Sequence, residues 1–274
     1  MKYLHLRDGG AMPALGLGTY RLEGRAGYEV IRDALGIGYR HIDTAEAYDN
    51  ETEVGDAIRD AQIDRDALFV TTKIWPTHFR KKFVQLAAES SLRKLRCDYV
   101  DLILLHWPSE KVPLAETLEA LSSLLTRGHA RAIGVSNFSA QQIQEITQIH
   151  GIPLACSQIE YHALLDQRDA LERASNDSLV TVAHSPLAQG RLCNEPLLNE
   201  IGERYRRTAA QIGLRWLVQQ EGVGAIPKAS STASLMQNLE IFDFELSDDD
   251  MSRIFALNSG VRVVQARSET RSEA

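Results

Sequence analysis

Four side chains that could share proton-transfer chemistry follow one another along the first part of the chain: Asp43, Tyr48, Lys73 and His106. Asp43, Lys73 and His106 each end a short apolar run that is typical of a β-strand, and Tyr48 lies in the loop after the first of these runs. Because the carboxyl ends of parallel strands meet at one edge of a sheet, we expect these four side chains to converge.

A tyrosine beside a lysine can act as an acid–base catalyst. A free tyrosine has a pKa of about 10, and a nearby ammonium such as that of Lys73 lowers this pKa. Asp43 would keep Lys73 protonated, while His106 would donate a hydrogen bond at the same point as the Tyr48 hydroxyl. These two donors form a pocket for a carbonyl oxygen, with Tyr48 as general acid in reduction. The hydride must then come from a bound cofactor, and a nicotinamide is the usual one.

The elements that must position these residues alternate regularly between strand and helix. The predicted strands span Leu15–Gly18, Arg40–Asp43, Leu68–Thr72, Val100–His106, Ala130–Val135, Ala155–Ile159, Leu179–Ala183 and Gly224–Ile226. The predicted helices span Gly27–Leu35, Glu51–Asp60, Lys81–Leu95, Leu114–Arg127, a segment from Ser139, Arg168–Ser175, stretches ending near Gln220, Thr232–Leu239 and Asp248–Leu257. Ser139 and Ser247 are the predicted N-caps of two of these helices. The strands are continuously apolar, as in a parallel sheet covered on both faces.

Eight strand–helix units predict an α/β fold, a (β/α)8 TIM barrel in one domain over residues 1–274. An N-terminal β-hairpin turns at Asp8–Gly10, and the short polar tail after Gly260 is expected to be loosely ordered. The main competitor is a doubly wound sheet, which would require a glycine-rich fingerprint after an early strand. Leu15–Tyr20 supplies only a fragment of one.

Charge, cysteine usage and the absence of long apolar runs indicate which classes of protein and which cellular location to expect. The net charge of −7 argues against a nucleic-acid-binding surface. Cys97, Cys156 and Cys193 are far apart and have no metal-ligand spacing with the histidines, so we expect a reducing compartment and no metal site. The sequence has no signal peptide pattern and no apolar run near the ~20 residues of a membrane span. A soluble, cytoplasmic protein is therefore expected.

The segment Gly38–Ala45 resembles the first signature of the aldo-keto reductase family, and Gly134–Phe138 resembles the second. The resemblance extends over almost the whole chain and implies that Asp43, Tyr48, Lys73 and His106 are catalytic. It further implies a nicotinamide cofactor whose carboxamide is held by Ser136, Asn137 and Gln158. The cofactor-binding set implied by the resemblance is Gly18, Thr19, Tyr20, Asp43, Ser136, Asn137, Gln158, His184, Ser185, Pro186, Leu187, Gln189, Ile226, Lys228, Ala229, Ser230, Ser231, Ser234 and Asn238.

Three positions depart from the family pattern. His184 stands where relatives stack a tyrosine or tryptophan on the nicotinamide, and Ala229 replaces a serine or threonine. Ser234 replaces an arginine that contacts the adenosine 2′-phosphate in relatives, which leaves Lys228 as a cation for that phosphate. We expect NADPH as the better cofactor, with tolerance of NADH.

The substrate site is expected to be walled by aromatic side chains that follow strand ends: Tyr20, Trp75 and Trp107, together with Tyr48 and His106. Such walls favour small carbonyl compounds. Short loops resemble the compact bacterial members of the family, including 2,5-diketo-gluconate and methylglyoxal reductases. The resemblance also implies a monomer.

Two other classes of function fit parts of the sequence. A barrel with a lysine at a strand end could be a Schiff-base lyase or aldolase with Lys73 as nucleophile. The chain could instead be a non-catalytic, cofactor-binding regulatory subunit, because some family members have that role. Trapping with borohydride would reveal the first, and turnover of simple aldehydes would separate an enzyme from the second.

Overall fold

Eight parallel strands form the centre of the protein, whose computed structural model describes residues 1–7 and 10–265. They follow one another around the sheet in chain order as β3 (Leu17–Gly18), β4 (His41–Asp43), β5 (Phe69–Ile74), β6 (Val100–Leu105), β7 (Ala130–Ser136), β8 (Cys156–Glu160), β9 (Val180–His184) and β10 (Val223–Ala225). A parallel bridge from Leu15 to Ala225 joins the first strand region to the last. The sheet therefore closes on itself, which confirms the predicted barrel and excludes the open doubly wound sheet.

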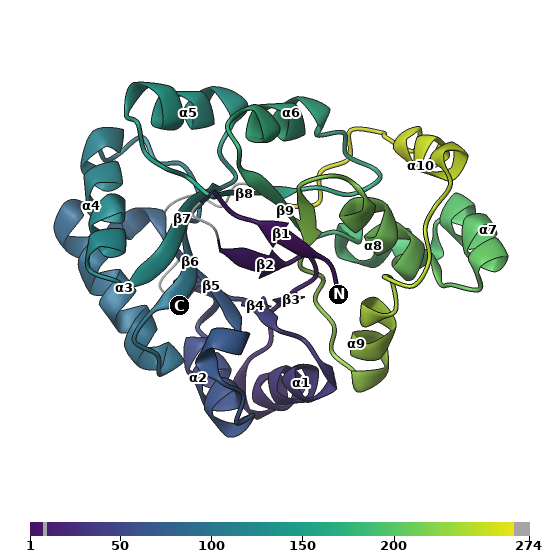
Figure 1. Ribbon diagram of the computed structural model, residues 1–274, viewed down its shortest axis with the longest axis horizontal. Coiled ribbons are helices and arrows are strands. Elements are labelled where there is room, and N and C mark those ends of the chain that lie inside the picture. The colour runs from purple at the N-terminus through teal and green to yellow at the C-terminus, as the bar shows by residue number, and fades with distance from the viewer. Residues whose placement is uncertain (8–9, 266–274) are drawn as a thin grey trace.

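The helices surround the strands, as Figure 1 shows. Their bounds are α1 (Gly24–Ile37), α2 (Glu51–Asp60), α3 (Lys81–Leu95), α4 (Leu114–Thr126), α5 (Ala140–Gln144), α6 (Arg168–Asn176), α7 (Pro196–Tyr205), α8 (Ala209–Gln219), α9 (Thr232–Leu239) and α10 (Asp248–Phe255). Short 3-10 helices occur at η1 (Glu46–Tyr48), η2 (Arg65–Ala67), η3 (Pro76–His78) and η5 (Ala188–Asn194), the last with a kink at Gln189 and Gly190. A short π-helix, η4 (Glu145–Ile149), follows α5. Among the helices of the described residues, none has the length and apolar character needed to cross a bilayer.

The hairpin β1 (Tyr3–His5) and β2 (Ala11–Pro13) lies across the centre of the ring of strands in Figure 1. Its apolar side chains Leu4 and Met12 are buried in one cluster with side chains from inside the barrel, such as Leu104 and Val182. The hairpin therefore caps the barrel interior with apolar residues. The predicted turn at Asp8 and Gly9 lies outside the described residues.

Several predicted boundaries differ from those of the structure. The first helix was expected to end at Leu35, before Gly36 and Gly38, but it continues through Gly36 to Ile37, and Gly38 forms its C-cap with a φ of 118°. A left-handed cap favours glycine, whereas Gly36 is tolerated within the helix. The strand before Lys73 extends to Ile74, so Lys73 lies inside β5, and β6 ends one residue before His106. Ser139 caps α5 through a capping box, as predicted.

The expectation of a loosely ordered tail is wrong for its described part, residues 261–265. The backbone N–H groups of Val263 and Val264 donate to the carboxylate of Glu160, at N···O distances of 2.6 and 3.1 Å. Glu160 is the last residue of β8 and is buried. The tail segment therefore docks against the carboxyl end of the barrel, and residues 266–274 lie outside the described residues.

Candidate active site

Three of the four predicted catalytic residues lie on or beside consecutive strands at the carboxyl end of the barrel. Asp43 ends β4, Lys73 lies one residue before the end of β5, and His106 directly follows β6. Tyr48 comes from the turn η1, which begins three residues after Asp43. The structure brings all four side chains together, as the strand order required.

Lys73 is the centre of this group. Its ammonium donates to Asp43 Oδ1 at 2.5 Å, to the Thr44 carbonyl at 2.8 Å and to the Tyr48 hydroxyl at 3.4 Å. The side chains of Lys73 and Asp43 are each only 1% exposed. An ammonium with three oxygen partners and almost no water is fixed in one orientation, and its charge points at the tyrosine.

The charge state of Lys73 agrees with the expectation from the sequence, whereas the direction of the Tyr48 pKa shift does not. Burial is the largest single effect and would lower the pKa of Lys73, but the charges and hydrogen bonds of Asp43 and Tyr48 together outweigh it, so the net pKa is raised and Lys73 remains an ammonium. The pKa of Tyr48 was expected to fall. It is raised instead, because loss of water around the hydroxyl outweighs the opposing effect of the Lys73 charge.

Aromatic rings pack against the Tyr48 ring and its neighbour His106. The centroid of the Tyr48 ring lies 5.2 Å from that of Tyr20 and 5.6 Å from that of His106. Trp75 packs edge-to-face on His106, with ring centroids 5.1 Å apart. Trp107 directly follows His106 and is half-buried. Four of the five predicted substrate-binding residues thus form one continuous chain of ring contacts.

Gln158 has a partner that the sequence did not suggest. It was predicted to bind a cofactor carboxamide, but its Nε2 donates to Asp43 Oδ2 at 2.7 Å in the structure. Asp43 therefore has one oxygen held by Lys73 and the other by Gln158. The two residues are 115 positions apart, and their spacing carries no local signal of the contact.

Ser136 and Asn137 lie beside Gln158, because Ser136 pairs in register with Gln158 between β7 and β8. The Asn137 Nδ2 donates to the His106 carbonyl and to Ser136 Oγ, each at 3.0 Å. Its Oδ1 lies 2.8 Å from His184 Nε2, and since an amide oxygen only accepts, that imidazole nitrogen donates. Burial lowers the pKa of His184 to about 4, so its ring is neutral at pH 7.

The segment after β9 forms a tight turn. Ser185, Ala188 and Gln189 all have positive φ angles, between 48° and 54°. Pro186 is buried, Leu187 is half-buried, and the exposed Gln189 donates from Nε2 to the Val263 carbonyl at 3.1 Å. This turn and the C-terminal segment therefore lie against each other.

The remaining predicted cofactor residues gather between β3, the end of β10 and the start of α9. The Gly18 N–H donates to the Pro227 carbonyl at 3.1 Å, and a Cβ at Gly18 would lie 2.6 Å from the Ile226 oxygen. Only glycine fits such a close approach. Thr19 is buried and its hydroxyl donates to the Asp43 carbonyl at 3.0 Å.

The N-terminus of α9 carries a cluster of hydroxyl groups. Ser231 is its N-cap and accepts from the Ser234 N–H, and its hydroxyl lies 3.0 Å from the Ser234 hydroxyl. Lys228 and Ser230 are exposed just before this helix, and Ala229 between them is buried. Asn238 differs from these residues in being buried, and it lies near the C-terminal end of α9, three residues after Leu235, whose carbonyl accepts from the Tyr39 hydroxyl at 3.1 Å.

Comparisons with known proteins agree with this architecture. Residues 14–259 match the model of the Aldo/keto reductase family. The chain is 39% identical over 259 residues to a glyoxal reductase of Bacillus subtilis (strain 168), covering 94% of this chain and 93% of that protein. It is 40% identical over 263 residues to YtbE, an uncharacterized oxidoreductase of the same organism, with 94% and 93% coverage.

A solved structure proposed to be a 2,5-diketo-D-gluconic acid reductase B superimposes with a TM-score of 0.93 and 40% identity, covering 98% of this chain and 97% of that one. MGS-M4, an aldo-keto reductase from a Medee basin deep-sea metagenome library, gives a TM-score of 0.92 and 34% identity, with 96% and 97% coverage. The sequence match and the shared barrel both extend over nearly the full length. The chain therefore belongs to the aldo/keto reductase family.

Proposed function

We propose that the protein is an NADPH-dependent carbonyl reductase that converts small aldehydes and ketones to alcohols, with Tyr48 as the proton donor. One observation carries this proposal: the Lys73 ammonium, paired with Asp43, lies 3.4 Å from the Tyr48 hydroxyl. A charge at that position stabilises the phenolate that remains after proton transfer.

The residues at the carboxyl end of the barrel suit a nicotinamide cofactor. Ser136, Asn137 and Gln158 supply a hydroxyl and two amides at adjacent strand ends, the donor and acceptor set that a carboxamide requires. The N-terminus of α9, with exposed hydroxyls and Lys228 beside it, suits a phosphate. When bound, a reduced nicotinamide supplies the hydride.

Each member of the site then has a separate task. Tyr48 and His106, whose rings are in edge-to-face contact, would orient the carbonyl oxygen, and Tyr48 would give it a proton. Asp43 keeps Lys73 charged, and Lys73 in turn favours loss of the Tyr48 proton. The aromatic side chains exclude water from the reacting carbonyl.

NADPH is proposed over NADH because Lys228 lies close to the α9 N-terminus, where a 2′-phosphate would bind. Ser234 offers a hydroxyl at this helix end and no charge, so discrimination against NADH is expected to be weak. We further propose that the protein acts as a monomer in the cytoplasm.

We infer 2-oxoaldehydes and keto-sugar acids as the substrate class. The glyoxal reductase among the relatives and the structure related to 2,5-diketo-D-gluconic acid reductase B support this choice. The chain of rings from Tyr20 to Trp75 would form one wall for such a small, polar carbonyl compound. A lyase with Lys73 as nucleophile is disfavoured, because a lysine with a raised pKa is a weak nucleophile.

The test combines cofactor binding with turnover. NADPH and NADH are titrated by fluorescence quenching, and absorbance loss is then followed with methylglyoxal and with a diketo-sugar acid. Tyr48→Phe is expected to lower kcat at least about a hundredfold while leaving the NADPH Kd nearly unchanged. Tyr28→Phe on the outer helix α1 is the matched control and should keep full activity. Binding without turnover would contradict the proposal, as would normal activity of Tyr48→Phe.

A further inference from the structure

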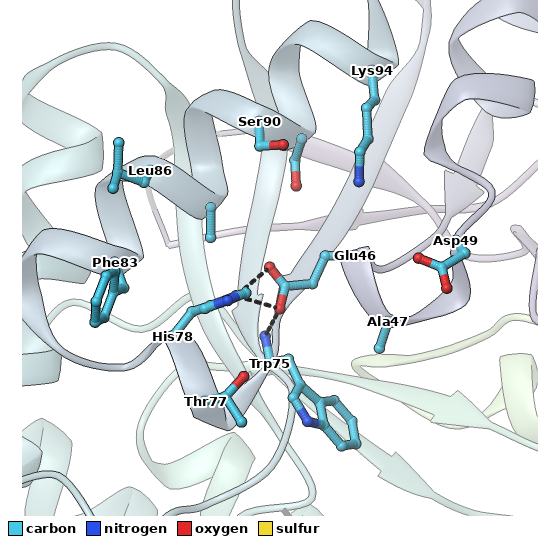
Figure 2. Close-up of a pocket in the computed structure, with 12 residues that line it drawn as sticks. Glu46, Ala47, Asp49, Trp75, Thr77, His78, Phe83, Leu86, Ser90 and Lys94 are labelled. Atoms are coloured by element: carbon cyan, nitrogen blue, oxygen red, sulfur yellow. Dashed lines mark hydrogen bonds and ion pairs between the residues drawn. The ribbon is translucent and has the colours of Figure 1, made fainter. Parts of the chain in front are cut away.

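Glu46 links the turn that carries Tyr48 to the end of the strand that carries Lys73. Its carboxylate accepts a hydrogen bond from the backbone N–H of Trp75 at 2.8 Å and lies 3.0 and 3.2 Å from His78 Nδ1. Figure 2 shows the carboxylate between these two partners. The Glu46 side chain is only 12% exposed, so this is a largely buried acid with specific partners.

Holding this acid in place has an energetic cost. Burial raises the pKa of Glu46, while the His78 imidazole and the Trp75 N–H oppose the rise. A buried carboxylate is unfavourable unless such donors compensate it. The two donors both belong to the segment Trp75–His78 that follows β5, so the compensation exists only while the η1 and η3 turns remain together.

The contact between Glu46 and Trp75 joins the same two chain segments as the contact between Tyr48 and Lys73. Glu46 lies two residues before Tyr48, and Trp75 lies two residues after Lys73. Two links therefore connect the same pair of segments: Lys73 to Tyr48 inside the barrel, and Glu46 to Trp75 outside it. The inner link is the longest of the three contacts of Lys73, at 3.4 Å, and cannot by itself hold the turn tightly.

The outer side of this turn faces open space instead of packed core. A cavity of about 460 Å³ separates it from α3 and is lined by Ala47, Asp49, Phe83, Leu86 and Lys94 as well as by Glu46 and His78. Figure 2 shows the Glu46 carboxylate facing α3 across this space. Apolar packing against α3 is thus weak here, and the hydrogen bonds of Glu46 replace it.

We propose that Glu46 is a positioning residue, which braces the η1 turn against Trp75 and so holds the Tyr48 hydroxyl at its working distance from Lys73. The same brace fixes Trp75, whose ring packs on His106. This inference rests on the proposed function, because it assigns Glu46 its role through Tyr48. The length of the side chain and its acceptor oxygen perform the task, and the negative charge is secondary.

Three substitutions of Glu46 separate the effect of side-chain length on kcat from the effect of the negative charge. Glu46→Gln keeps the length and an oxygen that can accept from the Trp75 N–H, and should retain kcat within about threefold. Glu46→Asp keeps the charge but is one methylene too short, and Glu46→Ala removes both features. Since small displacements of catalytic groups are costly, these two should lower kcat about tenfold or more, with little change in the KM for NADPH. Thr77→Ala, on the exposed surface of the same η3 turn, is the control and should match the wild type.

Amide hydrogen exchange gives a readout that does not depend on turnover. Glu46→Ala and Glu46→Asp should speed exchange at Trp75 and across residues 45–49, while Glu46→Gln and Thr77→Ala should not. If Glu46→Ala fails to fold, the comparison of Glu46→Asp with Glu46→Gln still decides the matter.

The outcomes separate this inference from the proposed function. A wild-type protein that reduces no carbonyl compound would contradict the proposed function. An active wild type whose kcat is unchanged in Glu46→Asp and Glu46→Ala would overturn only the role of Glu46. Equal losses in Glu46→Gln and Glu46→Asp would also overturn it, because the charge would then matter as much as the length of the side chain.

Discussion

The Lys73 ammonium lies 2.5 Å from Asp43 Oδ1, and both side chains are almost completely removed from water. Gln158 holds the second oxygen of Asp43, at 2.7 Å. The pair is thus an ion pair with further hydrogen bonds on both partners, the arrangement in which burying two charges is tolerated. The ion pair holds the Lys73 ammonium in an orientation in which it also contacts the Tyr48 hydroxyl.

This arrangement predicts strong coupling in stability between the two residues. Lys73→Met leaves the Asp43 carboxylate buried with Gln158 as its remaining side-chain donor, and should lower the free energy of unfolding by about 3 kcal/mol. Asp43→Asn should cost a similar amount, but the double variant should cost clearly less than the sum. Chemical unfolding of the four proteins measures this coupling. Additive losses would show that the pair contributes little.

The raised pKa of Tyr48 predicts an asymmetric pH dependence. In the proposed reaction, reduction needs the protonated tyrosine, which persists beyond the ordinary pKa of about 10, so kcat for reduction should stay level up to about pH 9. Oxidation of the alcohol needs the phenolate and should become faster as the pH rises. In Lys73→Met the ammonium that opposes the rise is gone, so the alkaline increase in oxidation should move to higher pH. Single-turnover profiles in both directions check this, and a shift to lower pH would contradict it.

A substitution of Ser234 by arginine is predicted to change the preference between NADPH and NADH. An arginine introduced at the N-terminus of α9 would add a charge-assisted contact to a 2′-phosphate, which NADH lacks. Ser234→Arg should raise the ratio of kcat/KM for NADPH over NADH by at least about tenfold. Ser234→Gln has a comparable reach without the charge and should leave the ratio close to that of the wild type. An unchanged ratio in Ser234→Arg would mean that the phosphate binds elsewhere.

Glu160 predicts an acid-sensitive attachment of the C-terminal segment. Burial alone would raise its pKa, but contacts from His162, Val263 and Val264 outweigh this and lower it. A lowered pKa in the folded state means that the attachment is stable above the unfolded value near 4.3 and is lost as the pH falls through the folded value. Glu160→Gln should therefore speed amide exchange at Val263 and Val264 at neutral pH about tenfold or more.

Glu200→Gln is the control for that experiment, because Glu200 forms an exposed ion pair with Arg253. It should leave exchange in the C-terminal segment unchanged. Equal exchange in Glu160→Gln and the wild type would show that other contacts hold the segment.

The sequence by itself determined the order of the strands and the place of each catalytic candidate at a strand end. Apolar runs and helix caps such as Ser139 and Ser247 are local features, and both caps are found where predicted. Repetition of one strand–helix unit then leaves few ways to bury every strand, so the barrel followed.

Tertiary structure decided the relations among the side chains. The contacts of Gln158 with Asp43, of Glu46 with Trp75 and of Glu160 with Val263 join segments that are 115, 29 and 103 positions apart. The direction of the Tyr48 pKa shift also depends on how completely neighbouring segments exclude water from its hydroxyl. The pattern of apolar and polar residues along the chain indicates which face of a helix or strand is buried. Which side chains form hydrogen bonds with one another, and how deeply each is buried, depends on the packing of distant segments.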